Sequence, residues 1–232
     1  MSTIERPGTR VLPPLVDGER LDRATFHERY EAMPPETRAE LIGGIVYMGS
    51  PLGYAHGTWD SDISDWLGHY KRWTKGIGKA HNATVQFDDY GEPQPDIQLR
   101  IPEALGGQSR IVDGYVSGPP ELLVEVAKSS RRIDLGPKKA DYERAGVLEY
   151  VVVGTDPEEI RWFERRGGRF VDRPADPDGI FRSRVFPGLW LDLRAFFAED
   201  TDHVIAVLEQ GLATPEHAAF VARLAARMGE TG

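Results

Sequence analysis

The sequence contains no cysteine, which excludes disulfide bonds, zinc sites with thiolate ligands and a cysteine nucleophile. It also lacks an apolar run of the roughly 20 residues that a membrane-spanning helix needs. Its first residues, MSTIERPGTR, contain no apolar signal core. We therefore expect a cytoplasmic protein with no membrane segment.

Basic residues are fewer than acidic residues in this sequence. Lys and Arg number 28 against 37 Asp and Glu, which gives a formal net charge of −9 over 232 residues. This balance argues against broad non-specific binding of nucleic acid, because such binding depends on Lys and Arg neutralising phosphates. A local basic groove is still compatible with it. The candidate is the run Lys128, Arg131, Arg132, Lys138 and Lys139, although a solvated helix face explains this run equally well.

Hydrophobic periodicity predicts a mixture of helices and strands. We expect helices at residues 26–34, 58–73 and 134–145, with Asp134 as the N-cap of the last one. Strands are expected at 81–87, 94–100, 121–128 and 148–154, a loop at 106–120, and hairpins around Gly43-Gly44 and Gly167-Gly168. Two further helices are expected within 202–229. An α/β or α+β fold follows, with a mixed central sheet flanked by helices and a C-terminal helical extension.

Two of these strands carry an acidic residue inside an apolar run. Asp96 lies in PDIQLR, and Glu125 lies in ELLVEVAK. Side chains alternate between the faces of a strand, so Asp96 and Glu125 point the same way if the two strands are neighbours. A pair of carboxylates suits Mg²⁺, which binds hard oxygen ligands and keeps several waters. The alternative is that Asp96 caps a turn after Pro95 and that Glu125 pairs with a basic residue.

The order and spacing of several short motifs resemble a known family. The motifs are AELIGGIVY from position 39, SPLGYAH from 50, PDI from 95, PPELLVEVAKSS from 119 and DLGPKKADYERAGVLEYVVV from 134. Together they resemble the putative restriction endonuclease family of the PD-(D/E)XK nuclease superfamily, over residues 26 to about 196. The resemblance implies a restriction-endonuclease-like mixed sheet and hydrolysis of DNA that depends on Mg²⁺, with Mn²⁺ as a substitute.

The resemblance also implies roles for individual residues. Asp96 and Glu125 match the metal-binding acids, Glu40 matches an acid of the first motif, and Lys138 matches a lysine on the following helix. His56 matches a histidine at the start of the long helix, without an assigned role.

The chain departs from the family pattern at two places. The compact superfamily motif has a lysine two residues after the glutamate, where this chain has Ala127. Lys128 follows, but it faces away unless a bulge turns it inward, so we expect Lys138 to be the catalytic lysine. Ile45 stands where relatives often carry a second glutamate.

We thus predict an Mg²⁺-dependent endodeoxyribonuclease that uses Asp96, Glu125, Lys138 and Glu40, with DNA as its partner. The alternative is a catalytically inactive protein of the same fold that acts as a binding module, which the acidic net charge and Ile45 favour. The expected organisation is an irregular arm at 1–25, a nuclease-like domain at 26–200 and C-terminal helices at 201–232. A homodimer is expected, with these last helices as one seam.

Overall fold

The computed structural model describes residues 12–49, 54–127 and 130–230. Its helices are α1 (Arg23–Glu31), α2 (Tyr54–Trp73), α3 (Arg131–Ile133), α4 (Lys139–Ala145), α5 (Leu193–Phe197), α6 (Thr201–Leu212) and α7 (Pro215–Glu230). A π-helical turn at Asp134–Lys138 joins α3 to α4, and a 3₁₀ turn lies at Glu103–Leu105.

The strands are β1 (Ala39–Ile42), β2 (Ile45–Met48), β3 (Gly78–His81), β4 (Val85–Gln86), β5 (Ile97–Arg100), β6 (Arg110–Val112), β7 (Tyr115–Ser117), β8 (Leu122–Ala127), β9 (Glu149–Thr155), β10 (Glu158–Arg166), β11 (Arg169–Arg173), β12 (Ile180–Arg182) and β13 (Trp190–Asp192).

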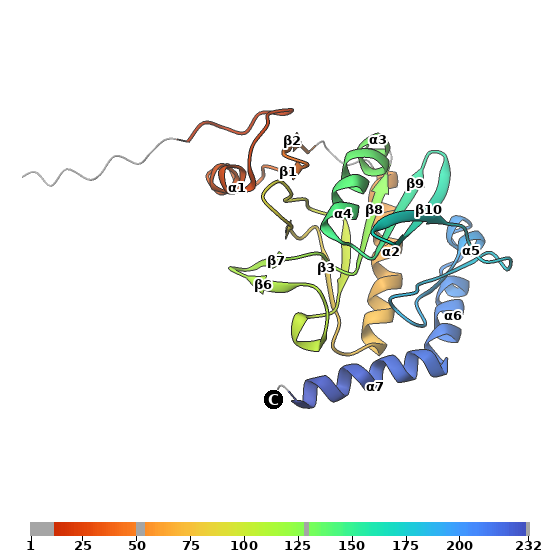
Figure 1. Ribbon diagram of the computed structural model, residues 1–232. Helices are drawn as coiled ribbons and strands as arrows, with labels where there is room; N and C mark the ends of the chain where they lie inside the picture. Colours follow the sequence, from red (N-terminus) through yellow and green to blue (C-terminus); the bar gives the residue numbers. More distant parts are fainter. Residues whose placement is uncertain (1–11, 50–53, 128–129, 231–232) are drawn as a thin grey trace, which may run out of the picture.

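Six of these strands form the central sheet, in the order β11-β10-β9-β8-β5-β3 (Figure 1). The pair β8 and β9 is parallel, whereas the other neighbours run antiparallel. The sheet is therefore mixed, as the sequence predicts. The apolar strand β9 lies in its interior, which agrees with its run of valines.

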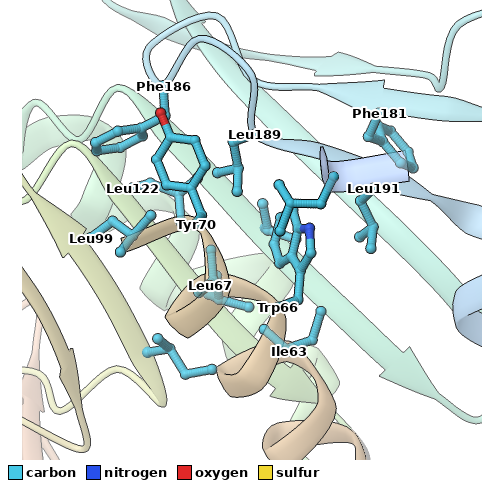
Figure 2. Packing of buried hydrophobic residues seen from close by; sticks show 14 of the residues in the cluster. Ile63, Trp66, Leu67, Tyr70, Leu99, Leu122, Phe181, Phe186, Leu189 and Leu191 are labelled. Carbon is cyan, nitrogen blue, oxygen red and sulfur yellow. The ribbon is translucent and has the colours of Figure 1, made fainter. Parts of the chain in front are cut away.

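One face of the sheet packs against α2, α6 and α7 and forms the main core. Strand β8 contributes Leu122, Val124 and Val126 to this face, and α2 contributes Trp66 and Tyr70. Figure 2 shows these two aromatic side chains among leucines of the sheet and of the 186–191 segment. Their polar atoms are satisfied, because the Trp66 indole donates to the Trp190 carbonyl and the Tyr70 hydroxyl to the Pro187 carbonyl.

The opposite face packs against α4 with a smaller apolar cluster that includes Leu123, Tyr142 and Tyr150. A third cluster joins α1 to the β1–β2 hairpin through Phe26 and Leu41. The hairpin turns at Gly43-Gly44, where both glycines have positive φ, as a two-residue turn of this kind requires. The sequence predicts this hairpin correctly.

Three predictions about local structure are wrong. The strand expected at 81–87 divides into β3 and β4, because Asn82 takes a left-handed φ of 49° between them. The loop expected at 106–120 contains the hairpin β6–β7, whose turn is the dipeptide Asp113-Gly114, with φ values of 50° and 88°. The helix expected to begin at Asp134 begins at Arg131, so Asp134 lies inside it and is buried rather than capping it.

The C-terminal helices α6 and α7 occur as expected and separate near Thr214. Val204 and Leu208 of α6, with Phe220 and Leu224 of α7, belong to the same buried cluster as the central sheet. Within the described residues, no helix has both the length and the apolar character needed to cross a membrane. The domain boundaries and the homodimer stay predictions.

Candidate active site

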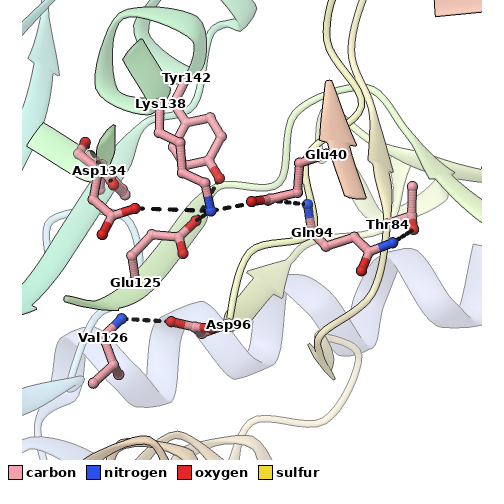
Figure 3. A network of polar contacts seen from close by, with 10 residues as sticks. Glu40, Thr84, Gln94, Asp96, Glu125, Val126, Asp134, Lys138 and Tyr142 are labelled. Atoms are coloured by element: carbon pink, nitrogen blue, oxygen red, sulfur yellow. Dashed lines mark hydrogen bonds and ion pairs between the residues drawn. The ribbon is translucent and has the colours of Figure 1, made fainter. Parts of the chain in front are cut away.

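Neighbouring strands bring Asp96 and Glu125 together. Strand β5 pairs with β8 in a register that places Ile97 opposite Val124, so Asp96 lies beside the backbone that follows Glu125. The Val126 N–H donates a hydrogen bond to Asp96 Oδ2 at 2.7 Å. Figure 3 shows both carboxylates at this end of the two strands. The strand alternation inferred from the sequence therefore places both acids on the α4 face.

Lys138 lies at the centre of the cluster (Figure 3). Its Nζ is 3.0 Å from Glu40 Oε1, 3.1 Å from Glu125 Oε1 and 3.9 Å from Asp134 Oδ1. The lysine side chain is only 7% exposed. The acids around this ammonium group come from β1, from β8 and from the π-helical turn that contains Lys138 itself.

The local backbone explains how Lys138 reaches the site. Residues Asp134–Lys138 form a π-helical turn that contains Pro137. Proline has no N–H to donate to the preceding turn, so a regular α-helix is disfavoured at this point. Single π-turns of this kind are frequent at functional sites. Here the turn puts Asp134 and Lys138 next to each other, and both are buried.

The charges of the cluster are strongly coupled. Burial raises the pKa of Glu125; Lys138 opposes this shift, whereas the nearby carboxylates of Asp96 and Asp134 add to it. Burial alone would lower the pKa of Lys138, but Glu125, Glu40 and Asp134 outweigh that effect and hold the lysine pKa above its ordinary value. Lys138 is therefore an ammonium ion, and Glu125 ionises less readily than an exposed glutamate.

Asp134 is an acid that the sequence reasoning assigned to the wrong role. Burial raises its pKa to about 6, against the lowering effect of Lys138. Ser130 lies one turn earlier, but no described residue donates a hydrogen bond of ordinary geometry to either Asp134 carboxylate oxygen. The available signal was its spacing of four residues from Lys138, which places both on one helix face.

Glu40 and Tyr142 complete the cluster. Glu40 Oε1 accepts a hydrogen bond from the Gln94 N–H at 2.7 Å, and its side chain is 22% exposed, more than those of Glu125 and Asp134. The Tyr142 hydroxyl donates to Glu125 Oε1 at 2.6 Å. The sequence places Tyr142 one turn beyond Lys138 as packing, but this hydrogen bond could not be read from it.

The basic run proposed as a groove is not a continuous surface in the described residues. Lys138 is buried in the acidic cluster, the Lys139 Nζ lies 4.3 Å from the centre of the Phe163 ring, and Arg131 pairs with Glu159. Lys128 lies outside the described residues. His56 falls within α2, but its side chain lies outside the description.

The donor set fits a divalent cation. Among the described residues, four carboxyl groups, those of Glu40, Asp96, Glu125 and Asp134, act on the ammonium of Lys138, so acids outnumber bases in this cluster. Among the described side chains no group of three acids or histidines converges as a full set of ligands. Asp96 and Glu125 alone would suffice for Mg²⁺, which is often held by one or two carboxylates and completes its shell with water.

Residues 24–194 match the sequence profile of the Uma2 family, which carries the description "Putative restriction endonuclease". The chain belongs to this family. The resemblance inferred from the motifs is therefore confirmed, and the description of the Uma2 family supports a nuclease-like function.

The fold of this Uma2 chain is also similar to a solved structure. That structure is titled as a putative nuclease belonging to DUF820 from Anabaena variabilis; the match has a TM-score of 0.58 at 14% identity and covers 74% of this chain and 96% of the other. At this identity the likeness shows the fold alone, and it confirms the predicted fold class. None of the curated proteins matches the sequence.

Proposed function

We propose that this protein is a metal-dependent DNA endonuclease, with Asp96 and Glu125 as metal ligands and Lys138 as the catalytic lysine. One observation carries the proposal: a buried lysine lies 3.1 Å from a buried glutamate, beside an aspartate of the neighbouring strand. Such a grouping is costly to bury for structural purposes alone, because paired charges seldom recover their loss of hydration. The family to which the chain belongs supports the reaction class.

The reaction is the hydrolysis of a phosphodiester. The oxygen of a water molecule attacks phosphorus, the ester bond to one sugar oxygen breaks, and that oxygen takes up a proton. A divalent ion bound by Asp96 and Glu125 would lower the pKa of the attacking water and would offset negative charge on the phosphate. Mg²⁺ suits these ligands, and Mn²⁺ is the expected substitute.

Side chains of the cluster would orient the attacking water and the metal-binding carboxylates and would stabilise charge on the phosphate. Lys138 keeps its proton beside the carboxylates, so its N–H groups can donate to the attacking water or to a phosphate oxygen as charge develops there. Tyr142 fixes the Glu125 carboxylate through its hydroxyl. Glu40 holds the other side of the Lys138 ammonium and ties it to the β1–β2 hairpin.

The competing function is a non-catalytic binding module of the same fold. It is favoured by the acidic net charge and by the absence, among the described residues, of three converging metal-ligand side chains. In that case Lys138 is simply the counter-ion of a buried acidic cluster.

The test combines cleavage with metal binding. Wild-type protein should nick DNA in the presence of Mg²⁺, lose this activity on chelation, and bind Mg²⁺ or Mn²⁺ in a calorimetric titration. Asp96→Ala should remove both properties while the circular dichroism spectrum is kept. The matched control is Asp172→Ala, which changes an exposed aspartate of β11. Cleavage that survives Asp96→Ala, or no metal binding at millimolar concentrations, would refute the proposal.

A further inference from the structure

A hollow of about 570 Å³ opens where the β1–β2 turn meets the N-terminal segment and the end of α4. It is lined by Arg20, Leu21, Asp22, Gly43, Gly44, Tyr90 and Arg144. We call it the Tyr90 hollow. Its size lies within the range of roughly 300–1,000 Å³ typical of small-molecule sites.

An aromatic ring is exposed in this hollow. Tyr90 is 54% exposed, although an aromatic side chain of this size usually buries its ring. The ring lies against the hairpin turn, because a Cβ atom added at Gly44 would come within 3.2 Å of it. The Tyr90 carbonyl also accepts a hydrogen bond from the Gly44 N–H at 2.8 Å. The main chain of Tyr90 is thus bonded to the hairpin turn, while more than half of the residue is exposed.

The charged groups of the hollow differ in how far they are engaged. Arg144 pairs with Asp88 and with the buried Asp141. Asp22 caps α1 by accepting hydrogen bonds from Thr25. Arg20 is exposed, and no ion pair joins it to another described residue. Arg20 is therefore the cation available to an anionic ligand.

The hollow lies a short way from the candidate active site along two elements. Gly43 directly follows β1 and lies three residues after Glu40, a distance of about 10 Å at the rise of a strand. Arg144 follows Lys138 by six residues, about 9 Å at the rise of a helix. The Gly43 N–H donates to Asp141 Oδ2 at 3.1 Å, and this hydrogen bond joins the hairpin turn to α4.

We infer that the Tyr90 hollow is a subsite for one unstacked nucleotide of the DNA substrate. The base would stack on the Tyr90 ring, and Arg20 would contact the neighbouring phosphate. Stacking on an aromatic side chain recognises the face of a base, which is covered in an intact duplex but free in a single strand or in a flipped nucleotide. This inference rests on the proposed function and adds that the enzyme engages an unpaired nucleotide beside the bond that it cuts.

The experiment measures binding of a short fluorescent single-stranded oligonucleotide by anisotropy, in an Asp96→Asn background so that the DNA stays intact. Tyr90→Ala should weaken binding at least roughly fivefold, the lower end of what a lost stacking contact costs. Tyr90→Phe keeps the ring and should restore binding. Arg20→Ala should weaken binding and reduce its dependence on salt.

The matched controls are Trp73→Ala and Arg72→Ala. Trp73 is an aromatic residue of similar exposure, 59%, and both residues lie in the last turn of α2 and do not line the hollow. Neither change should alter binding. Equal affinity of the Tyr90→Ala protein, or an equal loss with Trp73→Ala, would overturn the subsite and leave the proposed function standing. A wild-type protein that neither binds nor cuts any DNA would overturn both.

Discussion

The two faces of strand β8 are both buried but differ in the polarity of their side chains. Leu122, Val124 and Val126 point into the main core against α2, whereas Leu123 and Glu125 point towards α4. Both faces are almost fully buried, yet one contains only apolar groups and the other contains a carboxylate. Burying apolar area stabilises the fold, whereas burying a charge costs free energy unless it is paired. We infer that the α2 face contributes mainly to the stability of the fold. The α4 face contributes less stability, because it contains the buried charged groups of the candidate active site.

The largest effect is expected from Lys138→Ala. Its cleavage rate should fall by roughly 10²–10³ or more, because the variant loses the cationic donor of the site. Its free energy of unfolding should fall by about 3–5 kcal/mol, since the buried acids lose the ammonium group that lies among them. The control is Lys139→Ala, whose side chain lies over Phe163 and whose loss should leave the rate unchanged. Plasmid nicking and urea denaturation measure the two quantities.

Leu122→Ala tests the other face of the same strand. Leu122 is fully buried, so its truncation should cost about 2–5 kcal/mol of stability. The rate per folded molecule should be unchanged, because the cavity lies on the face away from Lys138. A variant that keeps its stability but loses cleavage would contradict the division between the faces.

The pH dependence of stability tests the buried acids of the α4 face. Burial raises the pKa of Asp141 to about 6, against the lowering effects of the Gly43 N–H and Arg144. The folded state therefore holds this proton more tightly than the unfolded state, and the associated stability is present below pH 4 and is lost as pH rises through 6. Asp141→Asn should remove this loss and raise stability at pH 8 by up to about 3 kcal/mol.

The control for Asp141→Asn is Asp172→Asn, which alters an exposed ion pair of β10 and β11. It should change stability by less than about 1 kcal/mol at any pH. Thermal unfolding followed from pH 4 to pH 8 separates the two variants, and a parallel pH profile for Asp141→Asn and wild type would refute the assignment.

The smallest effects are expected from removing one tyrosine hydroxyl on each face of the sheet. Tyr142→Phe removes the hydrogen bond to Glu125 and should cut the cleavage rate by about tenfold, as expected for the loss of one hydrogen bond to a charged group. Tyr70→Phe removes the bond to the Pro187 carbonyl on the α2 face and should cost only about 1 kcal/mol of stability. Equal rates in the two variants would indicate that Tyr142 is structural.

Much of the fold was predictable because local signals agreed with the final environment. Alternation placed Asp96 and Glu125 on one face, and Gly43-Gly44 marked the hairpin that carries Glu40. The wrong predictions occurred where a short turn lay within a stretch whose overall composition indicated a loop or a strand. The turn dipeptide Asp113-Gly114 was hidden in a glycine-rich stretch, and one left-handed residue, Asn82, divided an apparent strand.

The candidate site was predictable in its members but less so in its arrangement. The family resemblance indicated Lys138, whereas the π-turn in which Asp134 becomes buried could not be read from the sequence. The hydrogen bond from Tyr142 to Glu125 depends likewise on how α4 packs on the sheet. Such features come from tertiary packing, which a periodic pattern does not encode.

The most direct test of the central claim is a crystal structure of the wild-type protein soaked with Mn²⁺, with anomalous diffraction used to locate the ion. The account predicts one strong peak in coordination contact with both Asp96 and Glu125, with Lys138 beside it, and no such peak in Asp96→Ala. Lys138 still bonded to Glu125 with no Mn²⁺ between Asp96 and Glu125, or an ion bound elsewhere, would contradict it.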